Sequence, residues 1–305
     1  MKRKVIQLAG KTSVVSLPSK WVKKYNVKKG EELDLIENDK GELLIRTSSL
    51  ESRKSITLDI KDFNKRSIFY AMSALHKSGY DEIILFYYNK EQIEAINELL
   101  RVLLLGFVMV EQTTKKIVLR SVTNDISLEF DSTLRRAFLV TLSLADSSLD
   151  YIKDKNFKSL GSLINLENTN NQLTSFCLRL INKGLYSNEN TQFISIVIWS
   201  LEKIADEYKY ICNNLLNNDT EINLNLLSIY QETNEFLKNY YELFYKFSIE
   251  KLNLLSDKKS QILNLMSELE LKNANEINLL NHLNTIIAKT SDLSSSIFAI
   301  HHKLN

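Results

Sequence analysis

The chain has 305 residues, of which 44% are hydrophobic and 25% charged, a balance typical of folded globular proteins that excludes a disordered or fibrous chain. Its apolar runs fall short of the ~18 residues that a membrane span needs, and its basic start is no apolar leader, so we expect a cytoplasmic protein. The net charge of +2 is uneven, because residues 1–30 carry nine Lys or Arg and no Asp or Glu, which leaves residues 31–305 at −7.

The basic segment opens a region with the pattern of a small β-rich unit. Residues 4–17 contain two short β-prone runs, and Pro18 begins a brief helical segment. Two more β-prone runs follow within residues 32–46, around a hairpin signal at residues 38–41. The sequence predicts a compact ββαββ domain over residues 1–48, followed by a polar linker.

Residues 54–122 change to an alternation of strand and helix patterns, which predicts a small α/β domain. Gly79 and Gly106 are placed as helix C-caps, and no Gly-rich phosphate loop follows a strand. The β-prone runs are residues 56–60, 83–88, 107–111 and 117–121, and the helical patterns are residues 64–77 and 90–105.

Residues 131–305 have helical periodicity throughout and predict an antiparallel bundle. The pattern predicts two repeats of a three-helix unit, at about residues 131–217 and 224–305. The six expected helices cover about residues 131–152, 158–183, 189–216, 224–247, 249–272 and 275–304.

The cysteines and histidines give no sign of a metal or catalytic set. Cys177 and Cys212 stand alone in apolar patterns and are expected to be buried free thiols. The four histidines are expected at the surface; they are His76, His282, His301 and His302. Without a Ser, His and Asp set, a phosphate loop or a redox motif, we expect no enzyme.

Two stretches of the N-terminal domain, RKVIQLAGKTSVVSLPSKWV from Arg3 to Val22 and VKKGEEL from Val27 to Leu33, resemble the AbrB/SpoVT/MazE family of DNA-binding domains. That resemblance implies two chains that exchange hairpins to form one β-barrel, and a unit of about 48 residues is too small to bury an adequate core alone. It also implies contacts with double-stranded DNA from Arg3, Lys4, Lys11, Lys20, Lys23 and Lys24. The alternative is a solvated basic face that serves only solubility.

A second resemblance concerns the helical region. Ser200–Cys212, with sequence SLEKIADEYKYIC, is similar to the signature of the PhoU family of phosphate uptake regulators, whose helical repeats carry paired carboxylates. Residues four apart share one helical face, so Glu202 and Asp206 can face one cation or polar partner. Glu167 matches a facing carboxylate of the family, whereas Asn171 takes the place of a second one.

The carboxylates Glu167, Glu202 and Asp206 are therefore candidate ligands for a divalent or iron cation, because oxygen donors favour hard cations and iron over zinc. The alternative is a solvated helix face in which Lys203 and Lys209 pair with the acids. No carboxylate stands at the equivalent positions of the second repeat, which are within residues 282–288.

Together the two resemblances imply a homodimeric transcriptional regulator of phosphate transport or homeostasis. The alternative is a PhoU-type adaptor that docks on a phosphate transporter component or a kinase and uses its N-terminal module mainly for dimerisation. A third interpretation, an antitoxin, is disfavoured because the long helical region exceeds what a toxin-neutralising tail needs. Salt-dependent DNA binding discriminates between the first two.

Overall fold

The computed structural model describes residues 2–8, 10–37, 41, 43–47, 54–122, 130–186, 189–217 and 221–302. The chain divides into two compact units, Met1–Arg53 and Lys54–Asn305. The predicted turn at residues 38–41, apart from residue 41, and the predicted linker over residues 48–53 lie outside the described residues.

The N-terminal unit is a small β region with the predicted order of elements. Two antiparallel hairpins flank one short helix, and the first hairpin turns at Gly10, whose φ of +69° favours glycine. The elements are β1 (Val5–Leu8), β2 (Thr12–Val15), α1 (Ser19–Lys24), β3 (Leu33–Glu37) and β4 (Leu43–Thr47).

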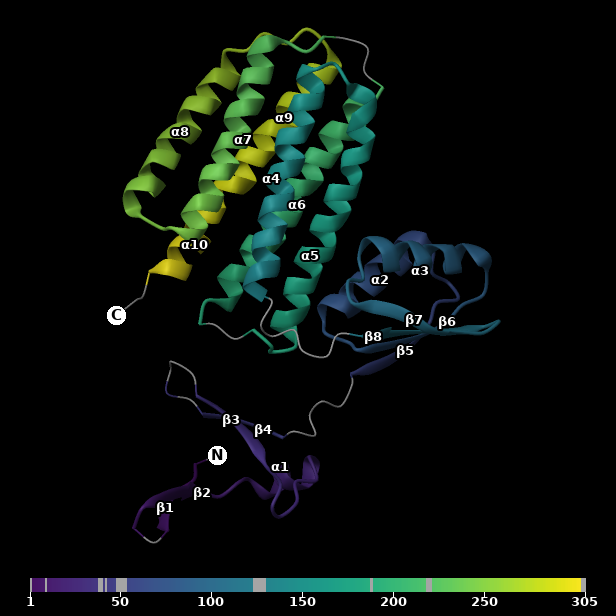
Figure 1. Ribbon diagram of the computed structural model, residues 1–305, viewed down its shortest axis with the longest axis vertical. Coiled ribbons are helices and arrows are strands. Elements are labelled where there is room, and N and C mark those ends of the chain that lie inside the picture. The colour runs from purple at the N-terminus through teal and green to yellow at the C-terminus, as the bar shows by residue number, and fades with distance from the viewer. Residues whose placement is uncertain are drawn as a thin grey trace. The chain divides into compact units, whose positions relative to one another are not determined.

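The second unit begins with the predicted α/β layer, a four-stranded sheet in the order β5-β6-β8-β7. Strands β5 and β6 are parallel, and the other neighbours are antiparallel. Helices α2 and α3 lie on one side of the sheet (Figure 1), and alternate residues such as Ile83 and Leu85 are fully buried beneath them. The elements are β5 (Ser55–Asp59), α2 (Lys65–Lys77), β6 (Glu82–Phe86), α3 (Lys90–Val102), β7 (Phe107–Gln112) and β8 (Lys116–Ser121).

The rest of the second unit is helical, and its long helices run side by side (Figure 1). They share one apolar core, to which both cysteines belong, so the prediction that Cys177 and Cys212 are buried is confirmed. Burial raises the pKa of each thiol to about 12. The elements are α4 (Phe130–Lys153), the 3-10 helix η3 (Phe157–Leu163), α5 (Ile164–Asn182), α6 (Thr191–Leu215), α7 (Leu224–Tyr245), α8 (Ile249–Ser267), α9 (Ala274–Ser291) and α10 (Leu293–His301).

Two of the predicted helices are subdivided. The helix expected over residues 158–183 begins as the 3-10 helix η3, and α5 starts only at Ile164. The helix expected over residues 275–304 is divided at Asp292 into α9 and α10. Apolar spacing does not reveal this second break, because Leu293 and Ile297 beyond it stay fully buried.

The α/β layer and the helical region pack together through α5, which contacts both α2 and α3. The chain leaves α2 through Gly79, whose φ is +81°, as the predicted C-cap requires. A Cβ atom at Gly79 would lie 2.7 Å from Cγ of Lys183, so this glycine also permits the close approach of α5.

Candidate functional site

The cations assigned to DNA contact all lie at the surface of the N-terminal unit. Two precede β1, one lies in the turn between β1 and β2, and three lie on α1. Every one of these six side chains is exposed: Arg3, Lys4, Lys11, Lys20, Lys23 and Lys24.

Helix α1 is amphipathic, and this sets the direction of its lysines. Trp21, Val22 and Tyr25 are half-buried, and the rings of Trp21 and Tyr25 lie 5.4 Å apart. Lys20, Lys23 and Lys24 lie on the other side of this six-residue helix and project into solvent. An apolar anchor with a cationic outer side can approach a phosphate backbone without burying an unpaired charge.

Three further cations extend this surface beyond the residues that the resemblance assigned. Lys2, Lys28 and Lys29 are also exposed, and the acid-free composition of residues 1–30 is the signal that includes them. Glu31 follows, but it accepts a hydrogen bond from the backbone N–H of Lys28 at 2.8 Å. Within the described part of this unit, none of the nine cations takes part in an ion pair.

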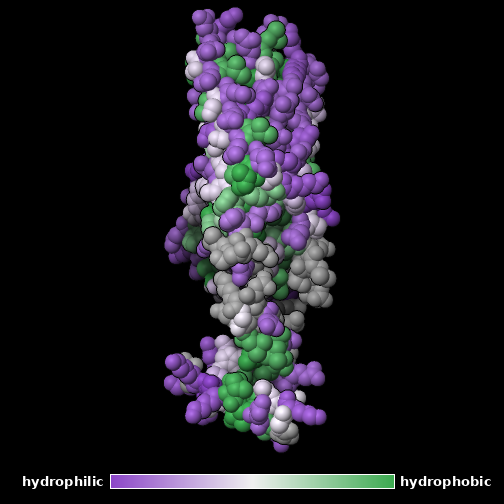
Figure 2. Space-filling model, turned by 90° about the vertical axis from the view of Figure 1, so that its left-hand side faces the viewer, coloured by the Kyte–Doolittle hydropathy of each residue, from purple (hydrophilic) through white to green (hydrophobic). Residues whose placement is uncertain are grey.

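The same unit exposes much of its apolar surface. In Figure 2, hydrophobic side chains gather in the middle of its visible face, with hydrophilic ones at the edges. Thr47 is the one buried residue among those of this unit whose burial is described. Between 50% and 66% of each of the following apolar side chains is exposed: Val5, Ile6, Leu8, Val15, Leu35, Leu43 and Leu44. A single copy therefore lacks a core of its own.

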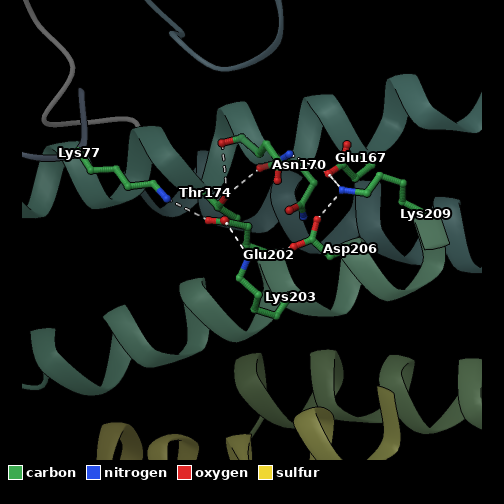
Figure 3. A network of polar contacts seen from close by, with 9 residues as sticks. Lys77, Glu167, Asn170, Thr174, Glu202, Lys203, Asp206 and Lys209 are labelled. Carbon is green, nitrogen blue, oxygen red and sulfur yellow. Dashed lines mark hydrogen bonds and ion pairs between the residues drawn. The ribbon is translucent and has the colours of Figure 1, made fainter. Parts of the chain in front are cut away.

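The candidate carboxylates of the helical region come together between α5 and α6 (Figure 3). Glu167 is 2% exposed. Its Oε1 accepts hydrogen bonds from Lys209 Nζ at 2.7 Å and from Asn171 Nδ2 at 2.8 Å. Asn171, which replaces a carboxylate of the resembled motif, thus supports the remaining one.

Three lysines neutralise these acids. Lys209 Nζ also contacts Asp206 at 2.6 Å, and Lys203 Nζ lies 2.8 Å from Asp206 and 3.3 Å from Glu202. Lys77 of α2 contributes the third ammonium group, 3.2 Å from Glu202 (Figure 3). Lys77 could not be assigned from the sequence, because 125 positions separate it from its partner. We call Glu167, Glu202, Asp206 and these three lysines the acidic seam.

The pKa shifts reflect this alternation of charges. Burial raises the pKa of Glu167, although the hydrogen bonds from Lys209 and Asn171 oppose it. Burial alone would also raise the pKa of Asp206, but hydrogen bonds from Lys203 and Lys209 bring it below its usual value. Both lysines have raised pKa values for the reciprocal reason, since the bonds to carboxylates outweigh their desolvation.

The geometry of the acidic seam favours ion pairing over metal coordination. Ammonium nitrogens lie where a cation between the carboxylates would have to bind. Among the residues that the structure describes, no group of three or more His, Cys, Asp or Glu side chains is arranged to hold a metal ion. The salt-linked helix face considered as the alternative is observed, but its side chains are only 3% to 33% exposed and are not fully solvated.

No helix in the described part of the chain combines the length and apolar character needed to cross a bilayer. No curated protein and no solved structure matches the chain. Residues 6–52 match the family model of the antidote-toxin recognition protein MazE, a bacterial antitoxin. The match leaves the α/β layer and the helical region outside it, so residues 6–52 alone are similar to a MazE/AbrB-type domain.

Proposed function

We propose that the protein is a homodimeric DNA-binding transcriptional regulator whose N-terminal unit contacts duplex DNA. The observation that carries the proposal is the set of nine exposed cations, without an acid, on residues 2–30 of a unit similar to a MazE/AbrB-type domain. Lys and Arg displayed in this way bind phosphates and release counterions, which gives affinity without sequence information.

Dimerisation is part of the same proposal. Seven apolar side chains of the two hairpins are at least half exposed in one copy, and burial of apolar area provides the main driving force for association. Two copies that interleave their hairpins into one barrel would bury this surface and present the basic residues twice. A two-fold display of cations suits the two-fold symmetry of a duplex site.

We assign the helical region the part of a sensor, with phosphate homeostasis as the regulated process. The support is the spacing of Glu202 and Asp206 on α6 opposite Glu167 on α5, which resembles the PhoU signature. The acidic seam also links this region to the α/β layer through Lys77. A change in the ion pairs of the acidic seam would therefore alter contacts of both the helical region and the α/β layer. We include no resident metal in the proposal.

Binding of the full chain to a mixed-sequence duplex, measured by fluorescence anisotropy between 50 and 200 mM salt, tests the proposal. We expect the logarithm of the association constant to fall linearly with that of the salt concentration, with a slope of about −0.9 per neutralised phosphate. A chain that sediments as a dimer but ignores DNA at low salt would favour the PhoU-type adaptor. Genome-wide mapping of bound sites, with and without phosphate starvation, tests the regulated process separately.

A further inference from the structure

The two faces of the β1–β2 hairpin differ in polarity, because successive side chains of a strand point to opposite sides. One face carries Ile6, Leu8, Thr12 and Val14, and the other carries Val5, Gln7, Ser13 and Val15. The first face is apolar except for Thr12. Among the residues of the two strands, all of them described, Val14 alone is half-buried in a single copy. The first face therefore turns inward, and the second is directed to solvent.

Gln7 and Ser13 form a polar pair on the outward face, next to the turn of the hairpin. The register places them directly opposite each other, and opposed side chains of an antiparallel pair have Cβ atoms about 5 Å apart. Both side chains are exposed, and neither has a hydrogen-bond partner among the residues that the structure describes. The amide of Gln7 and the hydroxyl of Ser13 are thus free to bond a ligand on this face.

Cations flank this polar pair along β1. Lys4 precedes the strand and Lys11 lies in the turn after it, and both side chains are exposed. A strand of four residues is about 14 Å long, which is comparable with the width of about 12 Å of the major groove of DNA. That groove admits a two-stranded ribbon. With the two lysines on phosphates at its sides, Gln7 lies between them and faces the bases.

We propose that Gln7 is the base-reading residue of the N-terminal unit and selects adenine in the major groove, with Ser13 contacting the adjacent base pair. The inference rests on the proposed DNA-binding function. The amide of glutamine is complementary to adenine, because it accepts a hydrogen bond from N6 and donates one to N7 at the same time. The hydroxyl of Ser13 donates or accepts, so it suits any base edge.

This assignment divides the work between two kinds of side chain. The lysines and Arg3 supply affinity through phosphates, which carry no sequence information, and Gln7 adds the sequence information. In a two-fold dimer Gln7 occurs twice, so the selected adenine should occur once in each half of a symmetric site.

Selection of duplexes from a randomised library by the full chain, followed by fluorescence anisotropy on the selected duplex, tests this inference. We expect the selected sequences to share one adenine in each half-site. Exchange of that A·T pair for G·C should weaken wild-type binding about 5- to 140-fold, the worth of one bidentate contact. An adenine analogue that lacks N7 at the same position should also weaken binding, because it removes one of the two hydrogen bonds.

Two substitutions of Gln7 give opposite expectations. Gln7→Ala should bind the A·T and G·C forms equally and keep the salt slope of the wild type, since the phosphate contacts are unchanged. Gln7→Arg should transfer the preference to guanine, because a guanidinium bonds O6 and N7 of that base. Gln192→Ala is the matched control, at an exposed glutamine of α6, and it should keep the adenine preference.

The remaining outcomes separate this inference from the proposed function. DNA binding without an adenine preference, or a preference that Gln7→Ala retains, overturns the role of Gln7 and leaves the DNA-binding function in place. An equal loss of affinity for every duplex in Gln7→Ala, together with a smaller salt slope, also overturns it, because Gln7 then contacts the phosphate backbone. A full chain that binds no duplex at low salt overturns both.

Discussion

The guanidinium of Arg179 in α5 and the carboxylate of Asp81 before β6 lie 2.6 Å apart, with 3% of the arginine side chain exposed. The same guanidinium donates to the backbone carbonyls of Tyr80 at 2.6 Å and His76 at 3.2 Å. Burial lowers the pKa of Arg179, and Asp81 opposes that shift. One buried cation thus joins the α/β layer to the helical region.

Arg179→Met should lower the free energy of unfolding by about 3 kcal/mol, because it leaves a carboxylate and two carbonyls without their buried partner. Urea denaturation measures the change. Lys183→Met is the matched control, since Lys183 also contacts Asp81 at 2.6 Å but is 30% exposed, and it should cost less than about 1 kcal/mol. Equal losses of unfolding free energy in the two variants would show that the buried arginine stabilises the protein no more than the more exposed lysine does.

His76 should make stability depend on pH, and it corrects the expectation that all four histidines lie at the surface. It is fully buried, with Nε2 3.1 Å from the carbonyl of Leu105, and burial lowers its pKa from 6.5 to about 4. As the pH falls below 6.5, His76 binds a proton in the unfolded chain, whereas the buried imidazole of the folded chain stays neutral down to about pH 4. The stability present above pH 6.5 is lost down to about pH 4, by up to about 3 kcal/mol.

Denaturation of the wild type and of His76→Gln at pH 7, 5.5 and 4.5 measures this effect. Glutamine retains a donor for Leu105 but does not titrate, so the variant should lose stability less steeply on acidification. His302→Gln is the control, because His302 is exposed, and it should follow the wild type. If the free energy of unfolding fell equally with pH in the wild type and in His76→Gln, His76 would not be the source of the pH dependence.

The parts of this architecture that follow from local patterns could be predicted from the sequence. The alternation in residues 54–122 and the periodicity of residues 131–305 gave the elements, since burial on one face imposes its period on the chain. The exposure of Lys11 or Lys23 followed from an acid-free segment. Pairs such as Arg179 with Asp81 could not be predicted, because 98 positions separate them and each charge alone looks like surface.

Within the acidic seam, Lys209→Met should lower the free energy of unfolding by about 3 kcal/mol, since the buried Glu167 carboxylate would lose its counterion. Adding Glu167→Gln should restore a large part of that loss, because the uncompensated charge is then removed. Lys203→Met is the control within the same network; Lys203 is 33% exposed, and about 1 kcal/mol is expected. A double variant no more stable than Lys209→Met would mean that the loss comes from packing.

Metal ions should not stabilise the wild-type protein. A ligand that binds the folded state raises the melting temperature, but the carboxylates of the acidic seam already contact ammonium groups at 2.6 to 3.3 Å. Thermal unfolding with EDTA, Mg²⁺ or Fe²⁺ should therefore give one midpoint. A higher unfolding midpoint of the wild type with either metal, absent from Glu202→Gln, would instead support metal binding by these carboxylates.

The final prediction concerns the DNA surface. Lys11→Glu combined with Lys23→Glu should abolish measurable duplex binding at moderate salt, because four charges are inverted on a dimer, and any residual salt slope should shrink by about 3 to 4 units. The matched control is Lys65→Glu with Lys90→Glu, which makes the same charge change at α/β-layer lysines that are 71% and 87% exposed. The control should bind like the wild type, and both variants should sediment as dimers. Equal weakening of DNA binding by the two double variants would show that only the net charge of the protein matters. Wild-type binding by Lys11→Glu with Lys23→Glu would show that the N-terminal hairpin and α1 do not form the DNA contact.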